Sequence, residues 1–122
     1  MLTVKTKLKN SSIEGIGLFA NEDIPKGKIV WEFSEGFDLE LTKEQFQSLN
    51  EPQQLQILKY SYLSGDRYVM CLDDARFFNH ADQPNVDCPE GNNCTANRDI
   101  KEGEELTCNY KEFDLDFKNK II

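Results

Sequence analysis

The single histidine of the chain, His80, directly follows Asn79 at the end of an aromatic run. A side-chain amide beside an imidazole can hold a polar ligand, and it can equally form a buried hydrogen-bonded pair in a turn. An imidazole that acts as a general base needs a reacting group or an orienting partner close by. The residues around His80 match no common hydrolase motif, so the pair considered alone favours a structural role.

Two further features have residue types suited to a ligand site. Gly15 and Gly17 flank Ile16, and two missing Cβ atoms allow a ligand to approach the backbone closely. The third glycine of a dinucleotide fingerprint is absent, so a bulge or turn is the alternative interpretation. Tyr110 closes a strand-like run that begins at Glu105. Its hydroxyl can project into a cleft, or it can lie in water at the edge of the core.

Short β-strands are predicted to position these residues. Apolar and β-branched residues separated by Pro and Gly turns predict strands over 3–9, 29–33, 68–72, 94–97 and 105–110. Residues 42–63 form a helical insert in which Thr42 and Gln45 make a capping box and Pro52 divides two short helices. In the C-terminal tail, every second residue is apolar at Phe113, Leu115 and Phe117. This alternation allows the tail to pair with a strand or pack on the domain. The pattern predicts a mainly β protein with one helical insert.

The composition narrows the classes of partner. The chain has 122 residues, which suits a single domain, and its 22 acidic and 14 basic residues give a net charge of −8. This charge disfavours direct nucleic-acid binding and is compatible with a basic partner, although solubility alone also explains it. No apolar run reaches the ~20 residues of a membrane span, and no secretory signal is visible. We therefore expect a cytoplasmic protein that does not bind membranes.

The four cysteines do not form a zinc motif. They contain no C-x-x-C spacing, and no second histidine completes a ligand set. Cys71 and Cys108 lie in apolar runs and are expected to be small buried hydrophobes. Cys88 and Cys94 flank a loop and could pair only in an oxidising compartment. We expect them to be free thiols.

The order and spacing of the three motifs resemble the SET-domain protein lysine methyltransferases. The resemblance rests on Gly15-Ile16-Gly17, on the Asn-His segment 76–85 and on the Glu-Leu-Thr-x-x-Tyr segment 105–110. It covers about residues 3–113. The length of the chain is similar to that of the minimal stand-alone forms found in bacteria and large viruses. It implies one domain over 1–122, made of small sheets with a C-terminal pseudoknot. No Cys-rich tail follows Tyr110, so the zinc-bound module of many relatives is not expected.

The resemblance also implies roles for individual residues. The backbone of Gly15, Ile16 and Gly17 would contact the methionine part of S-adenosyl-L-methionine, and Asn79 with His80 would hold the same cofactor. The pseudoknot would bring Tyr110 beside the cofactor as the catalytic residue. A substrate channel is expected to include Tyr68, Cys108 and Phe113. Cys108 stands where the family carries a Phe or Tyr that tunes methylation number, so di- or trimethylation is expected to be permitted.

The implied function is methyl transfer to the side-chain amine of a lysine in a protein substrate. In-line displacement from a sulfonium needs mainly positioning and electrostatics, but the lysine must arrive neutral, which costs about 4–5 kcal/mol at pH 7. The acidic chain suits a basic histone or histone-like substrate, and the protein is expected to be a monomer or a homodimer. A nuclear location is expected if the source is eukaryotic or viral. The alternative is a catalytically inactive SET-fold module that only docks a basic partner.

Overall fold

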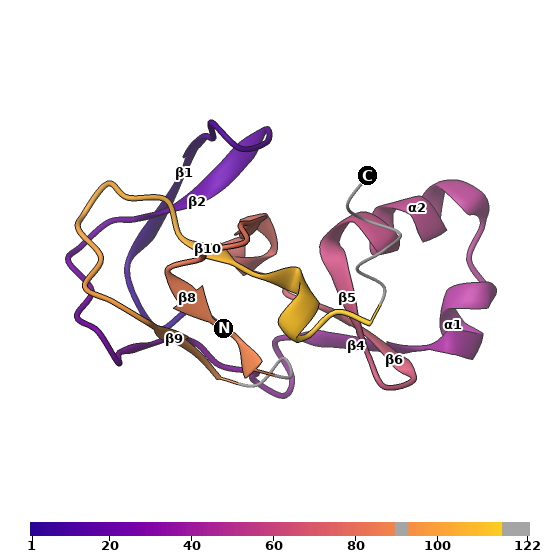
Figure 1. The fold of residues 1–122 in the computed structure, drawn as a ribbon. Helices are drawn as coiled ribbons and strands as arrows, with labels where there is room; N and C mark the ends of the chain where they lie inside the picture. The colour runs from indigo at the N-terminus through magenta and orange to yellow at the C-terminus, as the bar shows by residue number, and fades with distance from the viewer. Residues whose placement is uncertain (90–92, 116–122) are drawn as a thin grey trace.

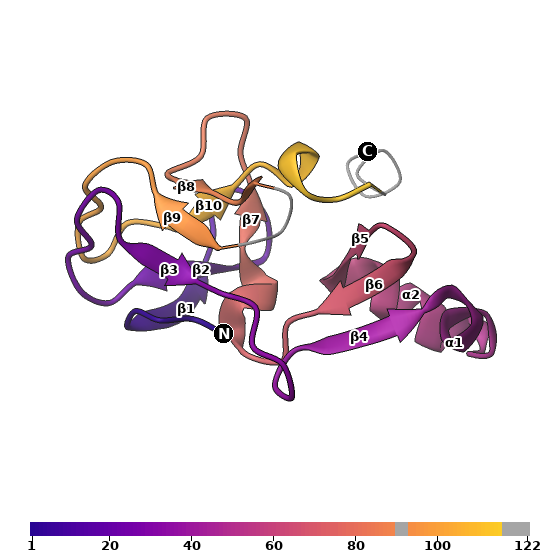
Figure 2. The ribbon, with the colours of Figure 1, turned by 90° about the horizontal axis from the view of Figure 1, so that it is seen from below.

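Short strands in several small sheets make up most of the regular secondary structure (Figures 1 and 2). The computed structural model describes residues 1–89 and 93–115. Its strands are β1 (Thr6–Asn10), β2 (Ile16–Ala20), β3 (Ile29–Trp31), β4 (Leu39–Thr42), β5 (Ser61–Ser64), β6 (Arg67–Met70), β7 (Asn79–His80), β8 (Val86–Asp87), β9 (Cys94–Ala96) and β10 (Thr107–Cys108). Its helices are α1 (Lys43–Gln47) and α2 (Glu51–Tyr60), with the 3-10 turns η1 (Asp74–Phe77) and η3 (Tyr110–Glu112). The predicted mainly β class is confirmed.

The sheets form two groups. One group contains the β1-β2 hairpin, the β3-β9-β8 sheet and the parallel β10-β7 pair, and the other contains the β4-β6-β5 sheet with α1 and α2 (Figure 2). Fully buried aliphatic residues from distant parts of the chain fill the first group: Leu18, Ile24, Val30, Val86, Ile100 and Leu106. In the described part of the chain, no helix is long and apolar enough to cross a bilayer.

The helical insert begins where the sequence predicts and ends earlier. Thr42 accepts from the Gln45 amide, and the Gln45 side chain accepts from Thr42, so the predicted capping box is present. Asn50 caps α2 in the same way, and Pro52 lies in the first turn of that helix, where a missing N–H costs nothing. The break between the helices therefore lies at residues 48–50 and not at Pro52. Residues 61–63 belong to β5, which pairs with β6, so their assignment to the helical insert was wrong.

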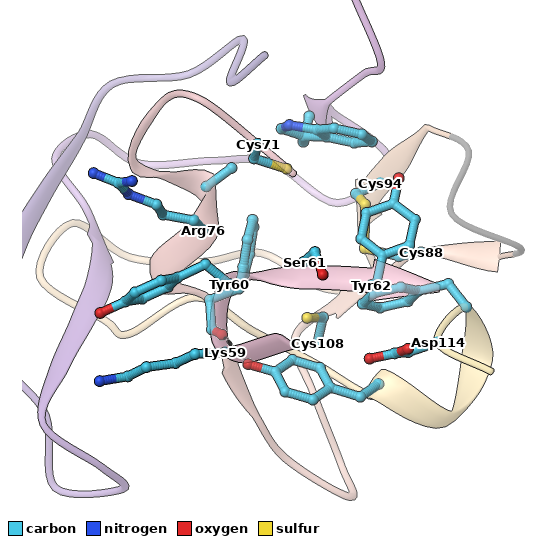
Figure 3. Close-up of a pocket in the computed structure, with 15 residues that line it drawn as sticks. Lys59, Tyr60, Ser61, Tyr62, Cys71, Arg76, Cys88, Cys94, Cys108 and Asp114 are labelled. Carbon is cyan, nitrogen blue, oxygen red and sulfur yellow. Dashed lines mark hydrogen bonds between the residues drawn. A yellow bond between two sulfur atoms is a disulfide. The ribbon is translucent and has the colours of Figure 1, made fainter. Parts of the chain in front are cut away.

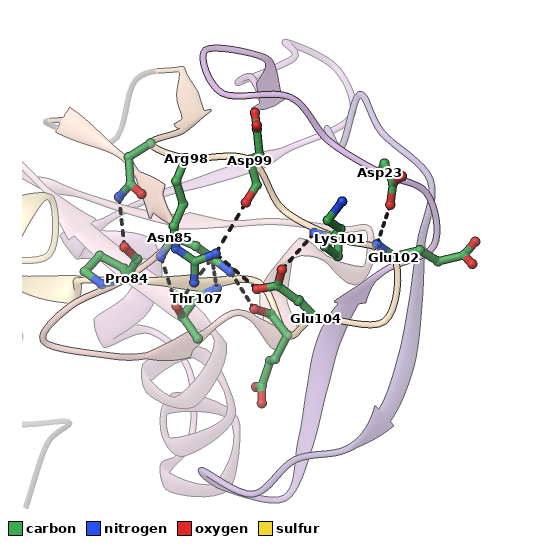
Figure 4. Close-up of polar contacts among 11 residues, drawn as sticks. Asp23, Pro84, Asn85, Arg98, Asp99, Lys101, Glu102, Glu104 and Thr107 are labelled. Atoms are coloured by element: carbon green, nitrogen blue, oxygen red, sulfur yellow. Dashed lines mark hydrogen bonds and ion pairs between the residues drawn. The ribbon is translucent and has the colours of Figure 1, made fainter.

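Two turns with similar sequences bind each other. Residues 23–27 and 99–103 both begin with Asp-Ile and end in Gly. Ile24 and Ile100 exchange two backbone hydrogen bonds of 2.8 Å. Asp23 accepts from the amide of Glu102 at 2.9 Å, a contact drawn in Figure 4, and Asp99 accepts from the amide of Lys26 at 2.8 Å. This reciprocal pairing fixes the start of the segment that carries β10.

The strand β10 lies between two earlier segments, as the predicted pseudoknot requires. Thr107 and Cys108 pair in parallel with Asn79 and His80. On the other side, the buried Asn85 side chain donates to the Glu105 carbonyl at 2.8 Å and accepts from the Thr107 amide at 2.9 Å (Figure 4). The strand predicted over 105–110 is shorter than expected, because the chain turns into η3 at Tyr110.

The expectation of free thiols at Cys88 and Cys94 was wrong, because the structure joins them in a disulfide. Strands β8 and β9 pair antiparallel, with Asp87 opposite Thr95, and this pairing brings the two Cα atoms within 4.2 Å. The sequence shows a loop between the two cysteines but not the register of the strands around it. Cys71 and Cys108 are free and buried, as predicted.

The tail is described only in part. Phe113 packs on the hydrophobic core, whereas Leu115 is 71% exposed. Phe117, the third member of the predicted period-two pattern, lies outside the described residues. The Leu115 amide donates to the carbonyl of Leu63 at 3.0 Å, so this segment runs along the edge of β5.

Candidate active site

A wide pocket lies between the β1-β2 turn, α2 and the segment 76–80. Its volume is about 790 Å³, within the usual range for small-molecule sites. Gly15, Ile16, Asn79, His80 and Tyr110 all line it, although they come from three separate parts of the sequence. The structure therefore brings together most of the residues that the sequence singled out for cofactor binding.

A second, narrow pocket of about 80 Å³ lies beside the first (Figure 3). Aromatic rings from several elements form its wall: Trp31, Tyr60, Tyr62, Phe78, Tyr110 and Phe113. The Tyr62 and Phe113 rings meet edge to face at 5.1 Å. Cys108 and the disulfide complete the lining, so the pocket is small and mostly apolar.

The two pockets share one wall. Phe78 and Tyr110 line both of them, as do Lys59, Tyr60 and Arg76. A ligand in the wide pocket and a side chain in the narrow one would therefore meet at Tyr110. This is the arrangement needed for transfer of a group between two bound molecules.

The Tyr110 hydroxyl donates a hydrogen bond to the carbonyl of Phe78. Burial raises the pKa of this hydroxyl above its usual value, and the nearby Cys108, Glu14 and Asp114 raise it further. Tyr110 is therefore a neutral phenol at physiological pH. It can orient a reacting group through its oxygen, but it is not a base that removes protons at pH 7.

His80 positions Tyr110 through its ring. The Nδ1 atom accepts from the Tyr110 amide at 3.1 Å, and Nε2 lies 3.1 Å from the Asp82 carboxylate. Because Nδ1 accepts, the proton of a neutral ring belongs on Nε2, facing Asp82. The imidazole thus connects β7 to the start of η3, a role that sequence reasoning did not predict.

Asn79 joins the hairpin turn to the C-terminal segment. Its side-chain amide donates to the Glu14 carbonyl at 3.1 Å and to the Glu105 carboxylate at 2.8 Å. Ser11 donates to the same carboxylate at 2.7 and 2.9 Å. Glu105 was not predicted as a site residue. The sequence did contain a signal for this role, because Glu105 is the one charged residue of the 105–110 motif.

Gly15 and Gly17 are needed for different reasons. Gly15 has a φ of +46°, which favours glycine, and no atom stands within 4 Å of where its Cβ would be. A Cβ on Gly17 would lie 2.3 Å from the Glu105 carboxylate. Gly17 therefore makes room for Glu105, whereas Gly15 and Ile16 face the wide pocket.

Two of the three predicted channel residues line the narrow pocket. Cys108 and Phe113 lie there, but Tyr68 packs on Phe46 with ring centroids 4.5 Å apart. Side chains alternate across a sheet, and Val69 is opposite Tyr62, so Tyr68 belongs to the other face. Tyr68 therefore lies outside the lining of the narrow pocket, and Tyr62 is the strand tyrosine on this wall.

Comparisons with known proteins give one family and one fold. The SET domain family profile matches residues 15–111. A candidate histone methyltransferase of Plasmodium falciparum has a TM-score of 0.64 at 22% identity, covering 89% of this chain and 95% of that one. A search of curated protein sequences gave no match.

Chains from Polycomb Repressive Complex 2 are also similar. A humanised mutant complex from Chaetomium thermophilum has a TM-score of 0.65 at 25% identity over 90% of this chain. An apo ctPRC2 with two mutations in Ezh2 has a TM-score of 0.69 at 26% identity over 95% of this chain. The protein spans only 15% and 16% of those two chains.

Proposed function

Because the chain belongs to the SET-domain family, we propose that it transfers methyl groups from S-adenosylmethionine to the side-chain amine of a lysine in a protein substrate. The observation that carries the proposal is the meeting of a wide and a narrow pocket at Tyr110. One pocket suits a small-molecule donor and the other an extended side chain. The family resemblance noted in the sequence is confirmed by the profile match.

The wide pocket has groups that suit each part of the donor. Gly15 and Ile16 offer backbone for the methionine part, and Asn79, which donates to the carbonyl of the neighbouring Glu14, lines the same pocket together with His80. The exposed Ile13 and Leu55 provide apolar surface for the adenosine part. When bound, S-adenosylmethionine supplies an electrophilic methyl group attached to a sulfonium.

The narrow pocket favours the neutral, nucleophilic form of the lysine amine. A protonated amine loses hydration among the rings of Tyr62, Phe78 and Phe113, so its pKa falls and the neutral nucleophile is favoured. The oxygen of Tyr110 can then orient the amine, because its own proton is donated to Phe78. These residues supply positioning and desolvation, and no covalent intermediate with the protein is needed.

The proposed substrate is a basic protein segment, such as a histone or histone-like tail. The net charge of −8 attracts such a segment by long-range steering. The P. falciparum relative, described as a candidate histone methyltransferase, supports the same class of substrate. The cytoplasmic location, or a nuclear one in a eukaryotic or viral setting, stays a prediction, and the Cys88–Cys94 disulfide does not favour it because disulfides are rare in reducing compartments.

Two variants test the division of roles. Tyr110→Phe should lower methyl transfer by about 10²-fold, since it removes one oriented polar contact at the reacting centre, while calorimetric binding of S-adenosylhomocysteine stays within about threefold of wild type. Asn79→Ala should weaken that binding by about tenfold, because the loss of its bonds to Glu14 and Glu105 loosens the hairpin wall.

The assay is labelled-methyl transfer to basic proteins, with Tyr60→Phe as a matched hydroxyl deletion on the same wall. Full activity of Tyr110→Phe would show that the assigned role is wrong. Binding of basic proteins without any binding of S-adenosylhomocysteine would favour the inactive docking module instead.

A further inference from the structure

All four cysteines of the chain lie around the narrow pocket. Cys71, Cys88, Cys94 and Cys108 come from four separate segments, and each one lines this pocket. Cys88 and Cys94 are joined in a disulfide, whereas the other two are free. In Figure 3 the disulfide lies on the side of the pocket away from Arg76. None of the described residues that line the wide pocket is a cysteine. The sulfur atoms are therefore gathered at the site proposed for the lysine and not at the site proposed for the methyl donor.

The disulfide joins two walls of the narrow pocket. Cys94 lies opposite Trp31 in the β3-β9 pair, and Trp31 lines the pocket as well. The amide of Cys88 donates a hydrogen bond to the carboxylate of Glu112 in η3, the turn that begins at Tyr110. The covalent bond thus connects a wall that is held by strand pairing to the turn that carries Tyr110.

Strand pairing stops just short of Cys88. Among the described residues, the pairing of β8 with β9 ends at Asp87 and Thr95, one position from each cysteine. A disulfide keeps its sulfur atoms at bonding distance, whereas two thiols must separate to van der Waals contact. A packed wall has little spare room, and Cys94 is held by its pairing with β3. Reduction is therefore expected to displace Cys88 and weaken its contact with Glu112.

The two free thiols are poorly suited to attack the disulfide. Cys71 and Cys108 are buried, and this burial raises the pKa of both thiols. They therefore stay protonated at pH 7, and only a thiolate attacks a disulfide. Reduction of the pair then depends on an external thiol, to which the pocket lined by Cys88 and Cys94 gives access.

We propose that Cys88 and Cys94 form a reversible redox site that controls the narrow pocket, with the disulfide as the active form and a dithiol as the class of reductant. One sulfur of the dithiol attacks the pair and forms a mixed disulfide, and its second sulfur then displaces the protein. Two electrons and two protons pass to Cys88 and Cys94, and the dithiol leaves as its own disulfide. The inference rests on the proposed function, because methyl transfer is the activity that the site would control.

The first test follows the redox state without turnover. Native protein is reduced with dithiothreitol and then reoxidised with oxidised glutathione, and its thiols are counted after denaturation by alkylation and intact-mass spectrometry. We expect two thiols, then four, then two again. Trp31 is the one tryptophan of the chain, so its fluorescence should change and recover in step with the count. The amides of Glu112 and Phe113, which donate within η3, should exchange hydrogen faster in the reduced protein.

The second test compares the activity of the two redox forms. Methyl transfer to core histones should fall by about tenfold or more on reduction, because a small misplacement at a reacting centre is costly. Binding of S-adenosylhomocysteine should change less than about twofold, since the disulfide does not line the wide pocket. A Cys88→Ser, Cys94→Ser double variant should behave like the reduced form and respond to neither reagent. Cys71→Ser should keep the ratio between the two forms.

The outcomes separate this inference from the proposed function. Equal or higher methyl transfer by the reduced form would overturn the inference and leave the function intact. A pair that resists dithiothreitol in the native protein, or loss of S-adenosylhomocysteine binding on reduction, would assign the disulfide to folding alone and would also overturn it. A response of the double variant to the reagents would place the sensitive group elsewhere. No methyl transfer by either form, together with no binding of S-adenosylhomocysteine, would overturn the function and the inference together.

Discussion

A single carboxylate organises the predicted motifs of the site. Glu105 accepts hydrogen bonds from Ser11 and Asn79 and lies against the backbone of Gly17. These residues are separated by up to 94 positions in the sequence. The Gly-x-Gly and Asn-His motifs are therefore physically connected through a residue that neither motif contains.

Gly17→Ala should destabilise the protein by about 2–4 kcal/mol, because its Cβ would displace a carboxylate held by two partners. Urea unfolding measures the loss. The same substitution in a Glu105→Ser background should cost much less than in wild type, since the obstructing carboxylate is gone. Equal costs in the two backgrounds would contradict the assigned contact.

Cys108 controls the free space of the narrow pocket. The thiol is 2% exposed and lines the pocket beside Tyr110. Under the proposed function, the wild-type protein is expected to give di- or trimethylated lysine, and Cys108→Phe is expected to stop at monomethylation because the larger ring fills the space. Intact-mass spectrometry of a methylated peptide reads the product directly. Cys108→Ala is the control for loss of the thiol, and strict monomethylation by wild type would refute the expectation.

At the scale of elements, pairing between distant segments shapes the site. The turns at 23–27 and 99–103 bind each other, and β10 then runs between β7 and Asn85. Each contact is made by short segments that have few local hydrogen bonds of their own. The positions of Tyr110 and Cys108 therefore depend on these contacts and not on the propensity of the 105–110 segment.

The β8-β9 hairpin provides the prediction at this scale. Alkylation of the denatured, unreduced protein should modify Cys71 and Cys108, and reduction should expose Cys88 and Cys94 as well. A Cys88→Ser, Cys94→Ser double variant should lose about 2 kcal/mol of unfolding free energy, because a closed loop restricts the unfolded chain.

Reductant should lower the stability of wild type to the level of this double variant and leave the variant unchanged. Four reactive thiols in the unreduced protein would show that the cysteines do not pair in solution.

For the whole molecule, several weakly acidic groups are buried together around the narrow pocket. Burial, together with smaller contributions from the nearby Asp38 and Asp73, raises the pKa of the Cys71 thiol from 9.0 to about 12. Burial also raises the pKa values of Tyr62, Cys108 and Tyr110. The folded protein therefore retains protons that the unfolded chain releases in alkali.

Stability should fall as the pH rises above about 9. A raised folded-state pKa contributes stability that is complete below the unfolded value and is lost as pH rises toward the folded value. Cys71 alone should account for a loss of about 1–2 kcal/mol between pH 9 and 10.5. Urea midpoints at pH 7.5, 9 and 10.5 measure the decline. Cys71→Ala should be less stable at pH 7.5 but show a shallower decline, and an identical slope would exclude this contribution.

Local sequence was sufficient for the features that depend on neighbouring residues. The capping box at Thr42, the Asp-Ile turns ending in glycine and the burial of Cys71 and Cys108 follow from residue type and spacing within a few positions. The order of the three motifs was enough to indicate the family. Periodicity also predicted the mainly β character, although not the bounds of the shortest strands.

The tertiary structure decided what depends on strand register and long-range packing. The disulfide, the exchange of Tyr68 for Tyr62 on the pocket wall and the contact of Gly17 with Glu105 all arise from pairing between segments far apart in sequence. Shifting a strand by one residue reverses the side that each residue faces, and no local pattern fixes that register.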